Sequence, residues 1–177
     1  SHAFPLSRIV YLANSEDERA LLDLLGLPAI LVNHNALLDE SLYEAVSDEI
    51  RVDAVYTASC AAYKRHHLAS SLRSLRLLSY CGSATVAEVD RLREQLGHAD
   101  WCNVRADGSF VWLNEAEVSR ALSDCGVGLC LSATEGAMFA SGEYLLLGLP
   151  VVTTPSHGGR DVFFDQSNTI VCAPDQE

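Results

Sequence analysis

Two glutamates in the last third of the chain have a spacing that suits a ligand rich in hydroxyl groups. Glu135 stands in a Thr-Glu-Gly turn after an apolar run, and Glu143, with seven residues between them, opens a run of leucines. This order predicts a strand, a loop and a helix, with one carboxylate at each end of the loop. A carboxylate at a helix N-terminus is favoured by the helix dipole and can accept hydrogen bonds from ligand hydroxyls. Taken singly, each is explained more simply, Glu143 as a helix cap and Glu135 as a solvated side chain.

The third chemical feature is Lys64, the only lysine among the 12 basic side chains of a protein with a net charge of −12. That charge argues against nucleic acid or an anionic membrane as an electrostatically attracted partner. The spacing of Leu68, Leu72 and Leu75 predicts a helix that begins near Lys64. A cation in the first helical turn is unfavourable unless an anion joins it. Lys64 is therefore the candidate phosphate-binding residue, and a solvated helix start is the simpler alternative.

The composition limits the other kinds of chemistry. With 177 residues, 49% of them hydrophobic and 20% charged, the chain suits a compact fold. No apolar run is long enough to span a bilayer, and residues 1–7 lack a secretory pattern. A cytoplasmic protein with reduced cysteines is therefore expected. The six cysteines and six histidines lack the spacing of metal ligands, so we expect neither a metal site nor a cofactor.

The elements that must position these side chains alternate along the sequence. Besides the helix at Lys64, helices are expected after Ser15, Thr85 and Asn114 and at Glu143. In the helix after Ser15, leucines 21, 22, 24 and 25 would face the core. Strands are expected at residues 8–13, 29–32, 52–57, 76–80, 101–104, 110–113, 126–131, 151–154 and 169–172. The predicted fold class is α/β, a doubly wound, mostly parallel Rossmann-like sheet with helices on both faces. Such sheets bind ligands at the carboxyl ends of their strands.

The C-terminal part of the sequence resembles a known family. Residues 127–175 are similar to the second half of the nucleotide-sugar-binding domain of family-four retaining glycosyltransferases of the GT-B fold. The family pattern Glu-Gly-x6-Glu, Gly-x-Pro-Val-Val and Gly-Gly is matched in register by Glu135-Gly136 through Glu143, Gly148-Leu149-Pro150-Val151-Val152 and Gly158-Gly159. Residues 55–64 look like that domain's first strand and phosphate-binding lysine. Residues 12–16, and less clearly 32–35 with Asp39 and Tyr43, look like the end of the preceding acceptor domain.

The resemblance implies a role for each candidate residue. Glu143 would bind the ribose hydroxyls of a nucleotide-sugar donor, Lys64 its diphosphate, and Glu135, at the catalytic position, the hydroxyls of the transferred sugar. Backbone N–H groups of Gly136, Ala137, Met138 and Phe139 would line the phosphate and sugar pocket. Enzymes of this family are similar in needing no divalent metal. The implied function is retaining transfer of a hexose-type sugar to an acceptor.

The resemblance also implies a domain division and an incomplete active site. Residues 1–46 would be the end of the acceptor domain with a linker, and residues 47–177 a nucleotide-sugar-binding domain truncated at its C-terminus. A GT-B active site lies between two domains, so the chain alone is expected to lack full activity and to pair with an acceptor domain or a second copy. Ser59 and Met138 stand where the family commonly has arginine and glycine. These departures keep open a non-catalytic nucleotide-binding or interaction module. A third alternative, a generic flavodoxin-like domain, would require residues 131–161 to lie away from any cleft.

Overall fold

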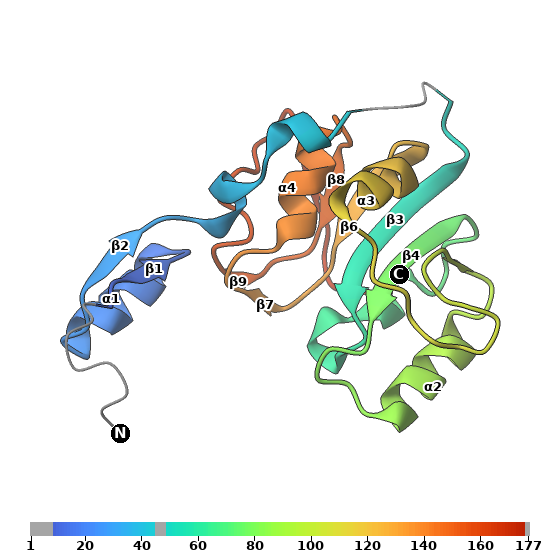
Figure 1. Cartoon of the computed structure of the whole chain (residues 1–177), viewed down its shortest axis with the longest axis horizontal. Coiled ribbons are helices and arrows are strands. Elements are labelled where there is room, and N and C mark those ends of the chain that lie inside the picture. The colour runs from blue at the N-terminus through green and yellow to red at the C-terminus, as the bar shows by residue number, and fades with distance from the viewer. Residues whose placement is uncertain (1–8, 45–48, 176–177) are drawn as a thin grey trace.

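A six-stranded parallel sheet forms the centre of the protein. The computed structural model describes residues 9–44 and 49–175, and the sheet has the strand order β10-β8-β6-β3-β4-β5 (Figure 1). Its strands, in chain order, are β3 Val52–Ser59, β4 Leu75–Tyr80, β5 Asp100–Trp101, β6 Cys125–Cys130, β8 Val151–Thr153 and β10 Thr169–Val171. Every pairing between them is parallel. The predicted α/β class with a doubly wound parallel sheet is confirmed.

The direction of winding reverses between β3 and β6. From β3 the chain moves through β4 to β5, and it then returns to the other side of β3 and continues through β6 and β8 to β10. Right-handed crossovers place α2 Val86–Gln95 on one face, and α3 Glu115–Leu122 and α4 Phe139–Leu146 on the other. Ligands of open α/β sheets bind at such a reversal, beyond the carboxyl ends of the strands. The segments that follow β3 and β6 carry Lys64 and Glu135.

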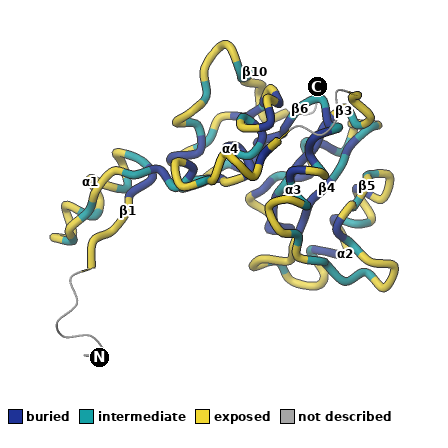
Figure 2. The backbone as a smooth tube through the Cα atoms, turned by 45° about the horizontal axis from the view of Figure 1, so that its top comes forward, coloured by how far each residue is buried: buried dark blue, intermediate teal, exposed yellow. Residues whose placement is uncertain are grey.

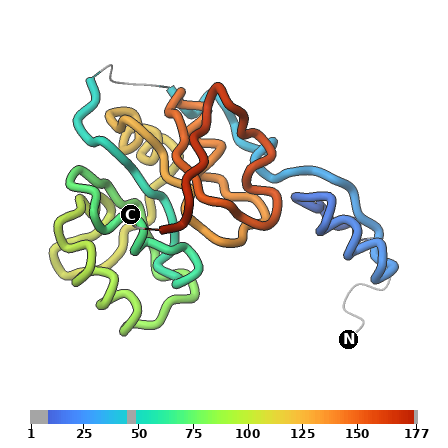
Figure 3. The backbone as a smooth tube through the Cα atoms, turned by 180° about the vertical axis from the view of Figure 1, so that it is seen from behind, coloured from blue at the N-terminus to red at the C-terminus, as the bar shows by residue number. Residues whose placement is uncertain are grey.

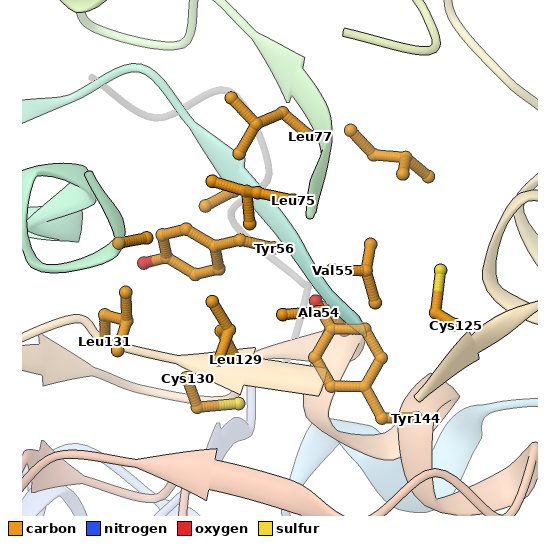
Figure 4. Close-up of a cluster of buried hydrophobic side chains, with 14 of the residues drawn as sticks. Ala54, Val55, Tyr56, Leu75, Leu77, Cys125, Leu129, Cys130, Leu131 and Tyr144 are labelled. Atoms are coloured by element: carbon orange, nitrogen blue, oxygen red, sulfur yellow. The ribbon is translucent and has the colours of Figure 1, made fainter. Parts of the chain in front are cut away.

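The core lies on both faces of β3. Val55 and Tyr56 are fully buried and point to opposite sides of the strand, where they meet residues of β4, β6 and α4 (Figure 4). Tyr144 of α4 lies flat on β6 because Gly128 has no Cβ, which would overlap the tyrosine ring. The Tyr144 hydroxyl accepts a hydrogen bond of 2.7 Å from the backbone N–H of Thr57. This contact fixes α4, which carries Glu143, against β3.

Sequence signals located three of the helix starts correctly, those after Ser15, Thr85 and Asn114. Thr85 and Asn114 form complete capping boxes. In each, the side chain of the cap residue accepts from the backbone N–H three residues later, and the glutamate at that later position accepts from the backbone N–H of the cap residue. Two other expectations were wrong. The segment from Lys64 to Leu75 is not an α-helix but two 3-10 turns, Ala62–Lys64 and His66–Ala69, followed by β4. Residues 101–104 and 110–113 form the end of β5 and one antiparallel bridge, Val104 to Phe110, rather than two full strands.

The N-terminal residues form a small unit beside the main sheet. Strands β1 Tyr11–Ala13 and β2 Ala29–Leu31 make a separate parallel pair, joined by helix α1 Glu16–Leu24. The unit projects from one end of the molecule, and most of its residues are exposed (Figures 2 and 3). The expectation that the α1 leucines face a core was wrong: α1 has no buried residue, and Leu24 is 83% exposed. Two strands and one helix supply no second layer to cover these side chains.

Residues 33–43 connect this unit to the sheet and lie against α4. They form two short 3-10 turns, His34–Leu37 and Glu40–Leu42. The Asn33 side chain donates to the carbonyl oxygen of Gly159 at 2.6 Å, and the Asn35 side chain donates to that of Met138 at 3.1 Å. The expected domain boundary at residues 46 and 47 lies outside the described residues. Among those described, no helix combines the length and the apolar character needed to cross a bilayer.

Candidate functional site

An open cavity of about 660 Å³ lies at the carboxyl ends of β3, β4 and β6. Its wall is built from Asn103 and five stretches that are far apart in the sequence: 37–43, 57–64, 78–80, 111–118 and 135–143. Six of the seven candidate residues line it, namely Lys64, Glu135, Ala137, Met138, Phe139 and Glu143. The seventh, Gly136, does not; it lies against the side chains of Asn14 and Glu18. The fold therefore brings nearly all of the predicted site to one place.

Lys64 is the last residue of a 3-10 turn, not the first of an α-helix. Its carbonyl oxygen accepts a hydrogen bond of 2.6 Å from the buried Tyr56 hydroxyl, and the next residue, Arg65, reverses the chain with a φ of 52°. The Lys64 ammonium forms an ion pair with Glu135 Oε1, and the two side chains are only 9% and 10% exposed. It also lies 5.1 Å from the centre of the Tyr63 ring. The cation is thus in the cavity, with its charge compensated by one carboxylate.

Glu135 is held by a two-residue strand and two glycines. Strand β7 Thr134–Glu135 pairs in parallel with β9 His157–Gly158, and the N–H of Gly159 donates to the Glu135 carbonyl at 3.1 Å. Gly158 has a φ of 110°, and a Cβ there would overlap the Glu135 carbonyl oxygen. The Gly-Gly pair of the sequence pattern therefore permits the close backbone approach that places Glu135 beside Lys64.

Glu143 lies inside a helix rather than at its start. Helix α4 begins at Phe139, so Glu143 is in its second turn, and the predicted helix boundary was four residues too late. Its Oε1 accepts a hydrogen bond of 3.0 Å from the Tyr43 hydroxyl. Burial raises the pKa of Glu143, the bond from Tyr43 lowers it, and the nearby Glu115 carboxylate raises it, with a net upward shift. Burial and the neighbouring Glu143 also raise the pKa of Tyr43, which therefore remains a hydrogen-bond donor.

The N-terminus of α4 opens into the same cavity. No side chain caps the helix at Met138, so its first backbone N–H groups have no side-chain acceptor. A free N-terminus with its N–H groups directed outward suits an anion. The Met138 side chain is buried, and its carbonyl oxygen accepts from Asn35 and from the Ser141 hydroxyl at 2.7 Å. The described residues include no cluster of three histidine, cysteine, aspartate or glutamate side chains arranged to hold a metal ion.

Two neighbouring residues have no direct part in the cavity. Ser59 is buried and does not line it. Arg65 points away from the cavity and donates to the carbonyl of Leu131 at 2.6 Å and to the hydroxyl of Thr154 at 2.8 Å. Arg65 therefore ties the ends of β6 and β8 together and supplies no charge to the cavity.

Sequence reasoning missed two aromatic contributions to the cavity wall. Tyr43 reaches Glu143 across 100 positions of sequence, a contact that no local spacing indicates. Trp112 is 82% exposed at the rim and meets the Tyr80 ring edge-on, with ring centres 5.9 Å apart. The sequence signal available for it was a tryptophan that follows the Asp107-Gly108 turn and stands two residues before the helix start at Asn114.

Comparison with solved structures identifies the fold. HepE from Anabaena, in complex with UDP, superposes with a TM-score of 0.65 at 17% identity, over 92% of this chain and 49% of that one. The C-terminal domain of LpcC, a group 1 family glycosyltransferase from Francisella tularensis, superposes with a TM-score of 0.56 at 11% identity, over 77% of this chain and 80% of that one. AviGT4, a glycosyltransferase of avilamycin A biosynthesis, superposes with a TM-score of 0.57 at 16% identity, over 94% of this chain and 50% of that one.

The class defined by these likenesses is the GT-B fold of glycosyltransferases, as the sequence resemblance implied. The chain spans about half the length of HepE and of AviGT4. No protein-family profile and no curated protein matches the sequence. At sequence identities of 11% to 17%, these likenesses show a shared fold. HepE, the Anabaena protein, was also solved in complex with UDP-glucose.

Proposed function

We propose that this chain is the donor-binding part of a retaining, metal-independent glycosyltransferase that transfers a hexose-type sugar from a nucleoside diphosphate. The observation that supports this most is the gathering of Lys64, Glu135, Glu143 and the open N-terminus of α4 around one cavity at the reversal point of the sheet. The fold shared with HepE, which was solved with UDP and UDP-glucose, agrees with it.

Each part of the cavity suits one part of a nucleotide sugar. Lys64 and the backbone N–H groups of residues 137–139, which line the cavity, are the groups that would stabilise the negative charge developing on a leaving diphosphate. Glu135 would accept from hydroxyls of the transferred sugar, and Glu143 from those of the ribose. Because Lys64 is paired with Glu135 in the free protein, the diphosphate must replace Glu135 as the ion-pair partner of the Lys64 ammonium. That exchange would free Glu135 for the sugar at the moment the donor binds.

Transfer itself would require a second domain. We propose that residues up to about 46 are the end of an acceptor domain and that the sheet from residue 47 onward is the donor domain. The exposed apolar side chains of β1, α1 and β2 and the half-length match to HepE support this division. The isolated chain should then bind donor but transfer almost no sugar. Self-association through the same face would be the other way to cover it.

A non-catalytic module with this fold is the second candidate. It is favoured by one observation: the charge of Lys64 is already compensated by Glu135, and the described part of the cavity wall contains no other lysine or arginine. In that case the ion pair would be structural, and the cavity would have no preference for a diphosphate.

Calorimetric titration with UDP, GDP, ADP and UDP-glucose separates the two candidates. The donor-site proposal expects at least one of these ligands to bind, with an affinity at least about tenfold weaker in Lys64→Ala, since a charge-assisted contact to phosphate is lost. Arg120→Ala is the matched control, because it removes one exposed positive charge outside the cavity. The proposal fails if no ligand binds at millimolar concentration, or if both variants bind like the unmodified chain.

A further inference from the structure

Tyr43 belongs to the connecting segment, yet its side chain forms part of the cavity. It follows the 3-10 turn Glu40–Leu42 and is only 5% exposed. Its hydroxyl donates to Oε1 of Glu143 at 3.0 Å. A residue of the N-terminal third therefore completes the surroundings of a carboxylate on α4.

Several contacts fix the connecting segment on α4 and so determine where Tyr43 lies. The Asn35 amide donates to the Met138 carbonyl at 3.1 Å and to the Ser141 hydroxyl at 2.9 Å. Leu38 packs over Gly142, where an added Cβ would come within 2.5 Å of a leucine methyl group. The small residues of α4 thus let the segment approach closely, directly beside Glu143.

The second oxygen of Glu143 is left for a ligand. Within the described part of the chain, Tyr43 is the only group that donates to this carboxylate, and it uses Oε1. The titratable groups that interact with Glu143 are Tyr43 on the connecting segment, Glu115 at the start of α3 and Tyr144, the next residue of α4. None of them is a cation, and no ion pair within the described residues holds the carboxylate. Elsewhere in the cavity, the charges of Lys64 and Glu135 compensate each other.

We propose that Tyr43 is a positioning residue for donor binding: its hydroxyl fixes the Glu143 carboxylate through Oε1, so that Oε2 remains directed to a hydroxyl of the bound nucleotide. This rests on the proposed function, since the ligand is the nucleotide of that site. The same bond is made to the charged form of the carboxylate, so it also favours ionisation at a position where burial opposes it.

Nucleotide binding should therefore depend on pH. The ionised carboxylate accepts charge-assisted hydrogen bonds at both oxygens, one from Tyr43 and one from a ligand hydroxyl, whereas protonation weakens both bonds. Binding is therefore strongest above the pKa of Glu143 in the folded protein and falls as the pH drops through it. Tyr43→Phe removes a bond that lowers this pKa, so the pKa rises further. The loss of binding should therefore begin at a higher pH in the variant than in the unmodified chain.

The test is the ratio of UDP dissociation constants, variant over unmodified chain, measured by calorimetry from pH 5.5 to pH 8.5. The ratio cancels the ionisation of UDP itself. For Tyr43→Phe we expect about tenfold at the acidic end, falling toward the basic end. Tyr11→Phe is the control, because Tyr11 lies on β1 outside the cavity and its ratio should stay near one. In a Glu143→Gln background, adding Tyr43→Phe should leave the pH profile unchanged.

Two results for Tyr43→Phe would overturn the proposal. One is a ratio near one at every pH. The other is a ratio raised equally at every pH, which is what a purely structural role of Tyr43 would give. If the unmodified chain binds none of UDP, GDP, ADP and UDP-glucose, the proposed function fails instead. The ionisation of Glu143 is then followed directly by carbon-13 NMR of its side-chain carboxyl in the free protein. A higher titration midpoint in Tyr43→Phe supports control of Glu143 by Tyr43, and an unchanged midpoint rejects it.

Discussion

The two ends of the cavity hold their carboxylates in different ways. At one end, Glu135 is paired with the buried ammonium of Lys64. At the other, Glu143 receives a hydrogen bond from the neutral phenol of Tyr43 and has a raised pKa. The sequence pattern treats the two glutamates as a matched pair. The structure distinguishes a compensated charge, which a ligand must compete for, from an uncompensated charge, which is available to a ligand but costly to bury.

This difference assigns opposite effects on stability to the two ends. Removing one member of a buried ion pair leaves the other charge uncompensated and destabilises the fold, whereas removing an uncompensated buried charge relieves a cost. Both changes should nevertheless weaken ligand binding. Separate measurements of stability and of binding can therefore test whether the two ends differ as described.

The largest effect is expected from Lys64→Met. It leaves Glu135 buried without its cation and should lower the free energy of unfolding by about 3 kcal/mol, measured by urea denaturation at pH 7.5. The double variant Lys64→Met, Glu135→Gln removes both charges and should recover most of that loss while still binding UDP poorly. An unchanged stability in the single variant would mean that the ion pair is not formed in solution.

The next effect concerns the glycine that supports Glu135. Gly158→Ala should cost about 2 kcal/mol or more, because a Cβ would overlap the Glu135 carbonyl oxygen and separate β7 from β9. Gly148→Ala is the matched control: its φ of 75° is also positive, but nothing lies within 4 Å of the added Cβ. The control should cost only about 1 kcal/mol for the left-handed backbone. Equal losses in the two variants would contradict the close approach at Gly158.

A smaller effect of opposite sign is expected at the other end. Burial raises the pKa of Glu143, so its contribution to stability is present at low pH and is lost as the pH rises through the folded-state pKa. Glu143→Gln should therefore match the unmodified chain near pH 4 and be more stable at pH 8, by up to about 1 kcal/mol. UDP binding should weaken in the same variant. A loss of stability that grows with pH would show that the carboxylate is compensated after all.

The smallest expected effect is that of chelation. If donor binding depends on Lys64 and backbone N–H groups, excess EDTA should leave the UDP affinity unchanged within about twofold. A clear loss, restored by magnesium, would contradict the metal-independent part of the proposal.

Local sequence signals predicted the elements better than the contacts between them. The parallel sheet followed from alternating strands and helices. Ser15, Thr85 and Asn114 marked three helix starts because capping is decided within four residues. The helix expected at Lys64 does not form. The leucine spacing was local, whereas Arg65 is held in a left-handed conformation with its side chain bound to Leu131 and Thr154, far along the sequence.

The candidate site shows the same limit. The spacing of Glu135 and Glu143, with Lys64, predicted residues that do line one cavity. It did not predict that Lys64 and Glu135 pair with each other, or that Tyr43 reaches Glu143, because both contacts form only when distant segments meet in the fold. The exposed leucines of α1 could not be anticipated either, since their periodicity is that of a helix with a covered face.

A crystal structure of this chain grown with UDP would show whether the cavity binds a donor nucleotide. We expect the diphosphate between Lys64 and the N-terminus of α4, with the ammonium moved away from Glu135 and a ribose hydroxyl on Glu143. A nucleotide bound elsewhere on the molecule, or a Lys64–Glu135 pair unchanged beside a bound diphosphate, would contradict it.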